Sequence, residues 1–293
     1  GYELEAWLVD DAMRPASVNA PFLAAMDKRM VSPELASFNV EFNFTPQILT
    51  GTALSTLHSE MDAVWIEGRQ QAHALGVELM QIGILPTVEP RDLTTAHISG
   101  LKRYQALNEQ VLRLREGRPL ELDIHGTEIL RHHHNDVMLE SVTTSFQIHI
   151  QVPLDQALRA YNAAIILSAP MVAVSANSPF LFGKDLWAET RIPVFEQAVA
   201  VGGLEQGAHG PMRRVTFGSG YARNSLMECF TENIEHYPIL LPTQFDDPIE
   251  NLAHVRLHNG TLWRWNRPLI GVDTATPHLR IEHRVVPAGP TNL

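Results

Sequence analysis

The sequence predicts an α+β fold in which helices flank a mainly antiparallel β-sheet. Several short segments alternate apolar and polar residues with the period of two that a strand shows. Longer segments with helical spacing interrupt them, and the pair Asn259-Gly260 joins two short segments in the pattern of a tight hairpin. No internal repeat, low-complexity linker or domain boundary divides the chain. We therefore expect a single domain over residues 1–293.

Four of the predicted strands keep one polar face each. They cover residues 1–10, 38–45, 145–152 and 278–286. In the first strand Glu3 and Glu5 share a face, and the side chains opposite them are apolar. A half-solvated strand with its acids in water explains this alternation equally well when the segment is taken alone.

Helical spacing and turn residues predict the remaining elements. We expect helices over residues 52–75, 101–114, 153–176 and 186–199, a strand over 77–84, and a hairpin of two strands over 253–258 and 261–266. Gly76 suits a left-handed cap for the first helix. Pro170 is expected to kink or break the third.

Composition limits the partners and the location of the protein. The chain carries 22 basic and 33 acidic residues, a net charge of -11, which argues against a nucleic-acid backbone or an anionic membrane as the main partner. The longest apolar run, residues 163–176, is shorter than the ~20 residues of a membrane span. Cys229 is the only cysteine, so no intrachain disulfide can form and a reduced cytoplasmic location fits. Its apolar neighbours predict a buried side chain rather than a catalytic thiol.

Two groups of histidines contain enough ring nitrogens for a metal site, but the spacing of the residues favours other structures. His132, His133 and His134 are adjacent, and neighbours in a strand point opposite ways, so we expect a solvated polar loop. His254 and His258 are four residues apart, as in helical zinc motifs, but we expect strands there.

The four polar faces carry acids, amides, a histidine or arginines, and none carries a lysine. A solvated sheet face normally mixes in Lys, Thr and Ser. We therefore predict that these faces line one pocket, formed by Glu3, Glu5, Glu41, Gln147, His149, Arg280, Glu282 and Arg284.

Crowded carboxylates in a half-buried pocket stay ionised together only when cations hold them. Oxygen ligands with one imidazole favour Mg²⁺ or Mn²⁺ over zinc. Arginines beside such ions suit an anion, and metals flanked by arginines suit the polyphosphate of ATP. The chain has neither a P-loop nor a dinucleotide fingerprint, so the nucleotide would be held by the sheet and the metals.

Five segments together resemble one known family along nearly the whole chain. They are residues 3–5 (ELE), 38–43 (FNVEFN), 144–149 (TSFQIH), 258–268 (HNGTLWRWNRP) and 280–284 (RIEHR). The family is the bacterial glutamate-cysteine ligase family 2, the carboxylate-amine ligases. Its members continue past the turn at 288–291 into further helices. The resemblance therefore implies a domain shortened at its C-terminus, and the start at Gly1 in mid-strand raises the same question for the N-terminus.

The resemblance also implies a glutamine synthetase-like catalytic domain, with a funnel-like antiparallel sheet, ATP at one mouth and metals at the waist. Glu5, Glu34 and Glu41 would hold one Mg²⁺, and Glu3, His149 and Glu282 the second. Glu41, Glu282 and Arg284 would be catalytic, while Gln147, Arg264, Arg267 and Arg280 would contact phosphates or the substrate carboxylate. The offset between Glu34 and Glu41 is odd, so a turn or bulge must intervene.

Three functions remain open at this point. The leading hypothesis is an ATP- and Mg²⁺-dependent ligase that forms an acyl phosphate on a small-molecule acid, such as glutamate, and transfers the acyl group to an amine. The alternative is a catalytically silent relative that binds a nucleotide or metabolite as a sensor. Metal-dependent hydrolysis at His132–His134 is a third hypothesis. The partners would be small molecules, with no nucleic acid or membrane, and a homo-oligomer is compatible with the sequence.

Overall fold

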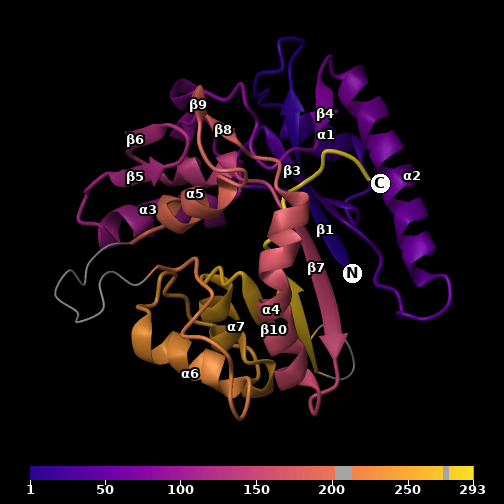
Figure 1. Cartoon of the computed structure of the whole chain (residues 1–293), viewed down its shortest axis with the longest axis vertical. Helices are drawn as coiled ribbons and strands as arrows, with labels where there is room; N and C mark the ends of the chain where they lie inside the picture. Colours follow the sequence, from indigo (N-terminus) through magenta and orange to yellow (C-terminus); the bar gives the residue numbers. More distant parts are fainter. Residues whose placement is uncertain (202–212, 273–276, 293) are drawn as a thin grey trace.

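A computed structural model describes residues 1–201, 213–272 and 277–292. Its main sheet is antiparallel and curled, with strand order β10-β11-β7-β1-β3-β2 and with β4 paired to β1 (Figure 1). The strands are β1 (Tyr2–Val9), β2 (Val31–Pro33), β3 (Asn39–Asn43), β4 (Glu78–Met80), β5 (Leu120–His125), β6 (Ile129–His134), β7 (Phe146–Val152), β8 (Phe180–Leu181), β9 (Lys184–Asp185), β10 (Asn266–Gly271) and β11 (His278–His283). The predicted α+β class with a mainly antiparallel, funnel-like sheet is confirmed.

The helices lie around this sheet. They are α1 (Asn19–Ala25), α2 (Ala53–Ala74), α3 (Lys102–Leu114), α4 (Ala157–Ser175), α5 (Arg191–Ala198), α6 (Met227–His236) and α7 (Ala253–Gly260), and η3 (Val137–Val142) is a 3₁₀ helix. The helix predicted over residues 52–75 corresponds to α2, and the strands predicted over residues 1–10 and 38–45 correspond to β1 and β3. Gly76 is left-handed, with φ of 72°, and follows the end of α2 as expected.

The two faces of β1 have different neighbours. Leu4, Ala6 and Leu8 belong to an apolar cluster with residues of α1, α2 and β3. On the other face Glu3 and Glu5 are followed along the strand by Trp7 and Val9. These two side chains belong to a second apolar cluster. The Trp7 ring stacks on Phe38 with a centroid separation of 5.5 Å. The polar part of this face is therefore limited to the end of the strand that carries Glu3 and Glu5.

The register brings the four polar faces together. Glu5 pairs with Glu41 of β3, and Glu3 pairs with Gln147 of β7. Further along the sheet, Glu282 of β11 lies between His149 of β7 and Arg267 of β10. Because directly paired residues share a face, these side chains all project from one side of the curled sheet.

The predicted hairpin at residues 253–266 is wrong. Residues 253–260 form α7, and the next strand, β10, begins only at Asn266. The Asn259 side chain is buried, where it accepts a hydrogen bond from Asn233 and donates one to the Pro268 carbonyl. These contacts with α6 and β10 outweigh the local turn preference of Asn-Gly. His254 and His258 therefore do lie on one helix, but the His258 ring contacts the Asn233 carbonyl at 3.0 Å.

The histidines at 132–134 do not form the expected solvated loop. They belong to β6, which pairs with β5 in a separate two-stranded sheet. Successive side chains alternate, so His133 is exposed whereas His134 is buried and lies 2.8 Å from Asp136. The three rings therefore do not converge on a common point, and the structure gives no support to hydrolysis at this segment.

Of the kink or break predicted at Pro170, the break does not occur, because helix α4 continues through this residue. By length and composition it is the one helix among the described residues that could cross a membrane. In the folded chain it packs on β10 and β11, and Ser168 accepts a hydrogen bond from Asn266 at 2.9 Å. Helix α5 begins later than predicted, at Arg191, because Trp187 and Thr190 form a hydrogen-bonded turn before it.

Replacing Gly218 with alanine is expected to destabilise the fold by about 1–3 kcal/mol, because a non-glycine residue is strained in the left-handed region. Its φ is 77°, and a Cβ would lie 2.1 Å from Nη1 of Arg264, a buried side chain held by an ion pair to Glu232. Urea unfolding measures the loss. Gly100→Ala is the matched control, since nothing lies within 4 Å of a Cβ there. Equal effects of the two substitutions would contradict the expectation.

Candidate active site

One group of ligand atoms comes from three neighbouring strands. Nε2 of His149 lies 3.3 Å from Glu3 Oε2 and 3.7 Å from Glu282 Oε1. One ligand atom from each residue lies within 4.8 Å of the others. The His149 Nε2 atom is buried and has no hydrogen-bond partner, although two carboxylates surround it. An unpartnered imidazole nitrogen between two carboxylates is a suitable donor set for a divalent cation.

A second group lies further along the same face of the sheet. It consists of Glu5, Glu34 and Glu41, whose ligand atoms again lie within 4.8 Å of one another. Glu34 directly follows β2 and precedes the turn that leads to β3. The turn required by the odd offset of Glu34 from Glu41 is therefore present.

Hydrogen bonds fix the carboxylates of this second group. Glu5 accepts from the Ser145 amide at 2.6 Å, from the Ser145 hydroxyl at 2.9 Å and from Gln147 at 2.8 Å. Glu41 accepts from the Ser32 hydroxyl at 3.0 Å. Fixed carboxylates of this kind present their remaining lone pairs in a constant direction, which favours a preorganised metal site.

The second group is poorly suited to hold its negative charge alone. Burial, together with the Glu3 and Glu5 carboxylates, raises the pKa of Glu41 to about 8. Burial and the neighbouring acids also raise the pKa of Glu34 well above its usual range. Burial raises the pKa of Glu5 as well, against the opposing effect of Arg284. A bound cation would reverse these shifts by supplying the missing positive charge.

Glu140 is a fourth acid in this region, and it is not among the residues predicted from the strand faces. Burial and the Glu5 carboxylate raise the pKa of Glu140 to about 8, and Glu140 in turn contributes to the raised pKa of Glu34. Glu140 lies in η3, outside any strand. Glu140 therefore belongs to no polar face with a period of two, and the residues around it carry no other signal.

Arginines hold Glu282 of the first group in its ionised form. Arg267 binds Glu282 through two hydrogen bonds of 2.7 and 3.0 Å, and Arg284 lies 3.3 Å from the same carboxylate. Burial alone would raise the pKa of Glu282, but Arg267 and Arg284 outweigh it and lower the pKa to about 2. Arg284, which directly follows β11, also donates to Gln147 of β7 and so connects the two segments. Arg191 is a further buried cation that was not predicted from the sequence, and its charge acts on Glu5.

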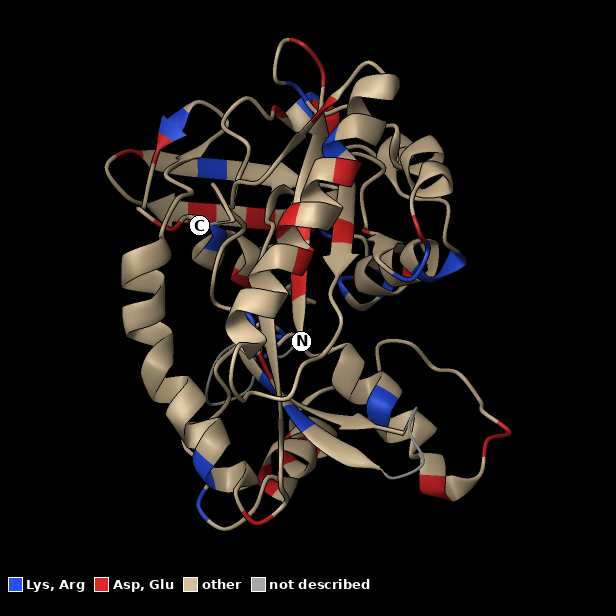
Figure 2. Ribbon diagram, turned by 90° about the vertical axis from the view of Figure 1, so that its right-hand side faces the viewer, with Lys and Arg blue, Asp and Glu red and all other residues tan. Residues whose placement is uncertain are grey.

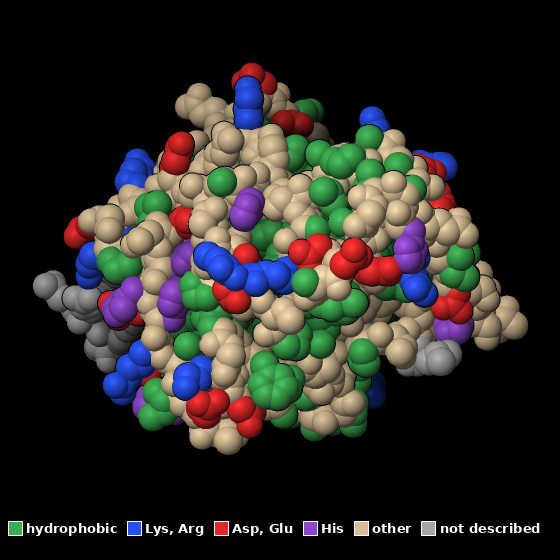
Figure 3. Space-filling view, turned by 90° about the horizontal axis from the view of Figure 1, so that it is seen from above, with side chains coloured by type: hydrophobic (Ala, Val, Ile, Leu, Met, Phe, Trp, Pro, Cys, Tyr) green, Lys and Arg blue, Asp and Glu red, His purple; other side chains and the backbone are tan. Residues whose placement is uncertain are grey.

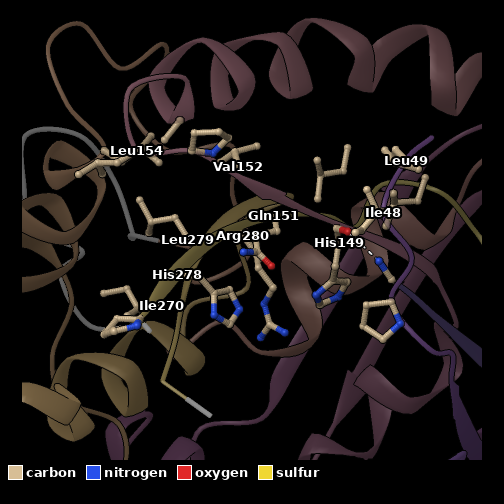
Figure 4. Close-up of a pocket in the computed structure, with 18 of the residues that line it drawn as sticks. Ile48, Leu49, His149, Gln151, Val152, Leu154, Ile270, His278, Leu279 and Arg280 are labelled. Atoms are coloured by element: carbon tan, nitrogen blue, oxygen red, sulfur yellow. Dashed lines mark hydrogen bonds between the residues drawn. The ribbon is translucent and has the colours of Figure 1, made fainter. Parts of the chain in front are cut away.

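The two other predicted arginines lie in different surroundings. Arg280 lines a cavity of about 1660 Å³, beside His149 and Gln151 (Figure 4). Arg264 is not brought into the group. It is 1% exposed, pairs with Glu232 at 3.0 Å and donates to Asn233 at 2.8 Å. Its contacts in this structure are with α6 rather than with the carboxylates of the sheet.

The lining of the cavity mixes polar and apolar side chains. Glu3, His149 and Arg280 contribute charged or ionisable groups. Ile48 and Leu49 contribute apolar side chains near His149 (Figure 4). The cavity therefore reaches the first group of candidate ligands, through Glu3 and His149, directly. Its volume exceeds the 300–1,000 Å³ that is usual for small-molecule sites, so it has room for a nucleotide.

Comparison with known proteins decides the family. Residues 1–287 match the family model described as glutamate-cysteine ligase family 2 (GCS2). The chain belongs to glutamate-cysteine ligase family 2. The resemblance inferred from five segments is thereby confirmed, and at the level of the family the chain is a ligase of the glutamate-cysteine ligase type, which joins a carboxylate to an amine. A search of curated proteins found no match.

Proposed function

We propose that the protein is an ATP- and Mg²⁺-dependent carboxylate-amine ligase that works through an acyl phosphate. The observation that carries this proposal is the pair of three-residue ligand groups on one face of the sheet, beside buried arginines and a large cavity. In the proposed reaction the γ-phosphoryl group of ATP moves to the oxygen of a carboxylate, and ADP leaves. An amine then attacks the acyl carbon, and phosphate leaves as the amide bond forms.

The residues present fit divalent cations. Glu5, Glu34 and Glu41 would hold one ion, and Glu3, His149 and Glu282 would hold a second. Five carboxylates with one imidazole form the oxygen-rich donor set that Mg²⁺ and Mn²⁺ prefer. When bound, such ions neutralise phosphate charge and polarise the oxygens of the transferred group. The unpartnered Nε2 of His149 and the raised pKa values of Glu34 and Glu41 support this assignment.

The chain's own cations would stabilise charge at the point of transfer. Arg284 lies among acids of both groups: burial opposes its charge, but Glu282, Glu5 and Glu3 raise its pKa. It is therefore a permanent cation between the two ligand groups. Arg267 keeps Glu282 ionised, and Arg280 offers a guanidinium inside the cavity. Preorganised charge of this kind is usually the largest contribution to catalysis.

The proposed partners are a small acid, of which glutamate is the first to test, and an amine. The surface agrees with small-molecule partners. On the face seen in Figure 3, acidic and basic side chains are interspersed, and the chain carries a net charge of -11. A nucleic-acid-binding face would be expected to show clustered Lys and Arg instead.

The test measures ADP release from Mg²⁺-ATP with a panel of acids and amines, and traps the intermediate with hydroxylamine. We expect ADP release that depends on acid and amine, and a hydroxamate when hydroxylamine replaces the amine. Mg²⁺-ATP binding without any hydroxamate would favour the silent nucleotide-binding protein. Absence of turnover with every acid and amine in a folded protein would contradict the ligase.

A further inference from the structure

Buried polar residues gather at the start of helix α5. Ser178, Glu189, Thr190 and Arg191 are each at most 5% exposed. Arg191 is the first residue of α5, and only 2% of its surface is exposed. Burial strips a cation of its hydration, and an apolar side chain of similar size would fill the same space with no such loss. The contribution of this guanidinium to the protein therefore lies in the groups that it binds.

Each nitrogen of the Arg191 guanidinium has a partner. Nε donates to Oε1 of Glu189 at 3.1 Å, Nη1 donates to the Arg284 carbonyl at 3.4 Å, and Nη2 donates to the Val285 carbonyl. The Glu189 carboxylate is held in turn by the Ser178 hydroxyl, at 2.8 Å. The guanidinium therefore joins the start of α5 to two consecutive carbonyls at the end of the main sheet.

The backbone that Arg191 binds lies just beyond a strand. β11 ends at His283, and its ladders with β10 and β7 end there too. Successive carbonyls of an extended strand point to opposite sides, so one planar guanidinium binds two of them only where the chain leaves the strand. The Arg284 amide donates to the Trp265 carbonyl at 2.9 Å. Arg191 therefore holds the carbonyl side of Arg284 at the point where the ladders have ended.

The Arg284 side chain extends from this backbone into the candidate active site. Its guanidinium lies 3.3 Å from Glu282 and donates to Gln147. Figure 2 shows several acidic residues and few basic ones around the middle of the molecule, so the place of each cation there affects the balance of charge. A misplacement of about 1 Å at a reacting centre can cost about 10²-fold in rate, even when the mutation lies far from the chemistry.

We propose that Arg191 is a positioning residue, which holds the backbone of residues 284 and 285 and so sets where the Arg284 guanidinium lies. This role rests on the ligase reaction proposed above, in which Arg284 stabilises charge at the point of transfer. Lysine at position 191 would keep the positive charge but end in a single ammonium, which does not reproduce the planar fork that binds both carbonyls. Arg191→Lys therefore separates the geometry of this residue from its charge.

The first test measures the steady-state kinetics of Arg191→Lys. We expect kcat to fall about 10²-fold, because Arg284 is misplaced in the transition state. The KM for ATP should change by less than about threefold, since the lost interaction acts on the chemical step. An unchanged kcat in a wild-type enzyme that turns over would overturn the positioning role and leave the ligase proposal intact.

Arg214→Lys is the matched control. Arg214 is fully buried, and its guanidinium also donates to two backbone carbonyls, those of Thr261 and Pro238. We expect this variant to lose stability but to keep the wild-type kcat per folded molecule. An equal fall of kcat in both variants would overturn the proposal, because it would reduce the effect of Arg191 to a general loss of packing.

A double-mutant cycle shows whether Arg191 acts through Arg284. In the Arg284→Lys background, Arg191→Lys should lower kcat by less than about twofold, because residues that act as a unit are not additive. A further loss of about 10²-fold in that background would overturn the proposal, since a structural effect would be independent of Arg284.

A measurement without turnover separates this proposal from the reaction. The Nε atom of Arg284 is buried, which protects its proton from exchange with water. Its Nε–H signal in protein labelled with ¹⁵N-arginine, assigned by its loss in Arg284→Lys, reports on the surroundings of the guanidinium. We expect this signal to move in Arg191→Lys and to stay in place in Arg214→Lys. Glu189→Gln, which removes the carboxylate that orients Arg191, should move it less in the same direction.

The outcomes of this measurement are distinct. A signal that moves in Arg191→Lys, in a protein whose wild-type form shows no ligase turnover, would support the positioning role and contradict the reaction. A signal that stays in place in both Arg191→Lys and Glu189→Gln would overturn the positioning role, whatever their turnover.

Discussion

Replacing either Glu3 or Glu5 with glutamine is expected to lower the ligase turnover by on the order of 10³-fold or more, the scale of losing a preorganised electrostatic group. Glutamine keeps the size of the side chain but removes the negative charge that a divalent cation requires. The two positions belong to different ligand groups, so each variant should lose a different ion. The measurement is ADP release at saturating Mg²⁺-ATP and substrates.

The folded state should survive both substitutions, because removing a like charge relieves repulsion within the crowded face. The unfolding temperature in EDTA reports on this directly and should be unchanged or higher. Glu67→Gln is the matched control, since Glu67 is exposed on α2 and should retain full activity. Full activity in Glu3→Gln or Glu5→Gln would refute the assignment of that residue as a metal ligand.

The metal-free protein is expected to lose stability as the pH rises from about 5 to 8. Glu41 has a pKa near 8 in the folded chain and Glu34 is also raised, whereas an unfolded glutamate titrates near 4.5. Between these values the folded state binds more protons than the unfolded state. The contribution of these protons to the free energy of unfolding is therefore fully present below the unfolded pKa and is lost as the pH rises to the folded pKa.

Magnesium should remove this loss, because an ion bound only by the folded state stabilises it by about 2.7 kcal/mol at 100 times its Kd. Thermal unfolding at pH 5, 6.5 and 8, with EDTA or with Mg²⁺ or Mn²⁺, tests both effects. Glu41→Gln should flatten the pH dependence in EDTA. Melting temperatures indifferent to both ions at pH 8 would argue against the two metal groups.

The strand faces could be predicted because their signal is local. Alternation in residues 1–10, 38–45 and 145–152 placed Glu3, Glu5, Glu41 and His149 on one side before any contact was known, and the register agrees. Their division into two ligand groups followed from the family resemblance. Alternation alone says which face a side chain takes, but not which strands become neighbours.

The wrong hairpin prediction and the two residues that were not predicted share one physical cause, which is contact between elements far apart in the sequence. Asn259-Gly260 has the local pattern of a turn, yet the Asn259 amide binds Asn233 and the Pro268 carbonyl across the fold. Glu140 reaches the acidic group from a 3₁₀ helix, and Arg191 reaches it from the start of α5. Periodicity carries no information about such residues, because their placement depends on how separate elements pack.

Strand β1 carries crowded negative charge and tightly packed apolar side chains on the same face. Its first half concentrates like charge at Glu3 and Glu5, and its second half, at Trp7 and Val9, is locked into the apolar core. Adjacent residues on one face are only about 7 Å apart, so the backbone transmits the position of one half to the other. We therefore expect a mutation that loosens the Trp7 packing to change the affinity of Glu3 and Glu5 for the proposed metal ions without altering either acid.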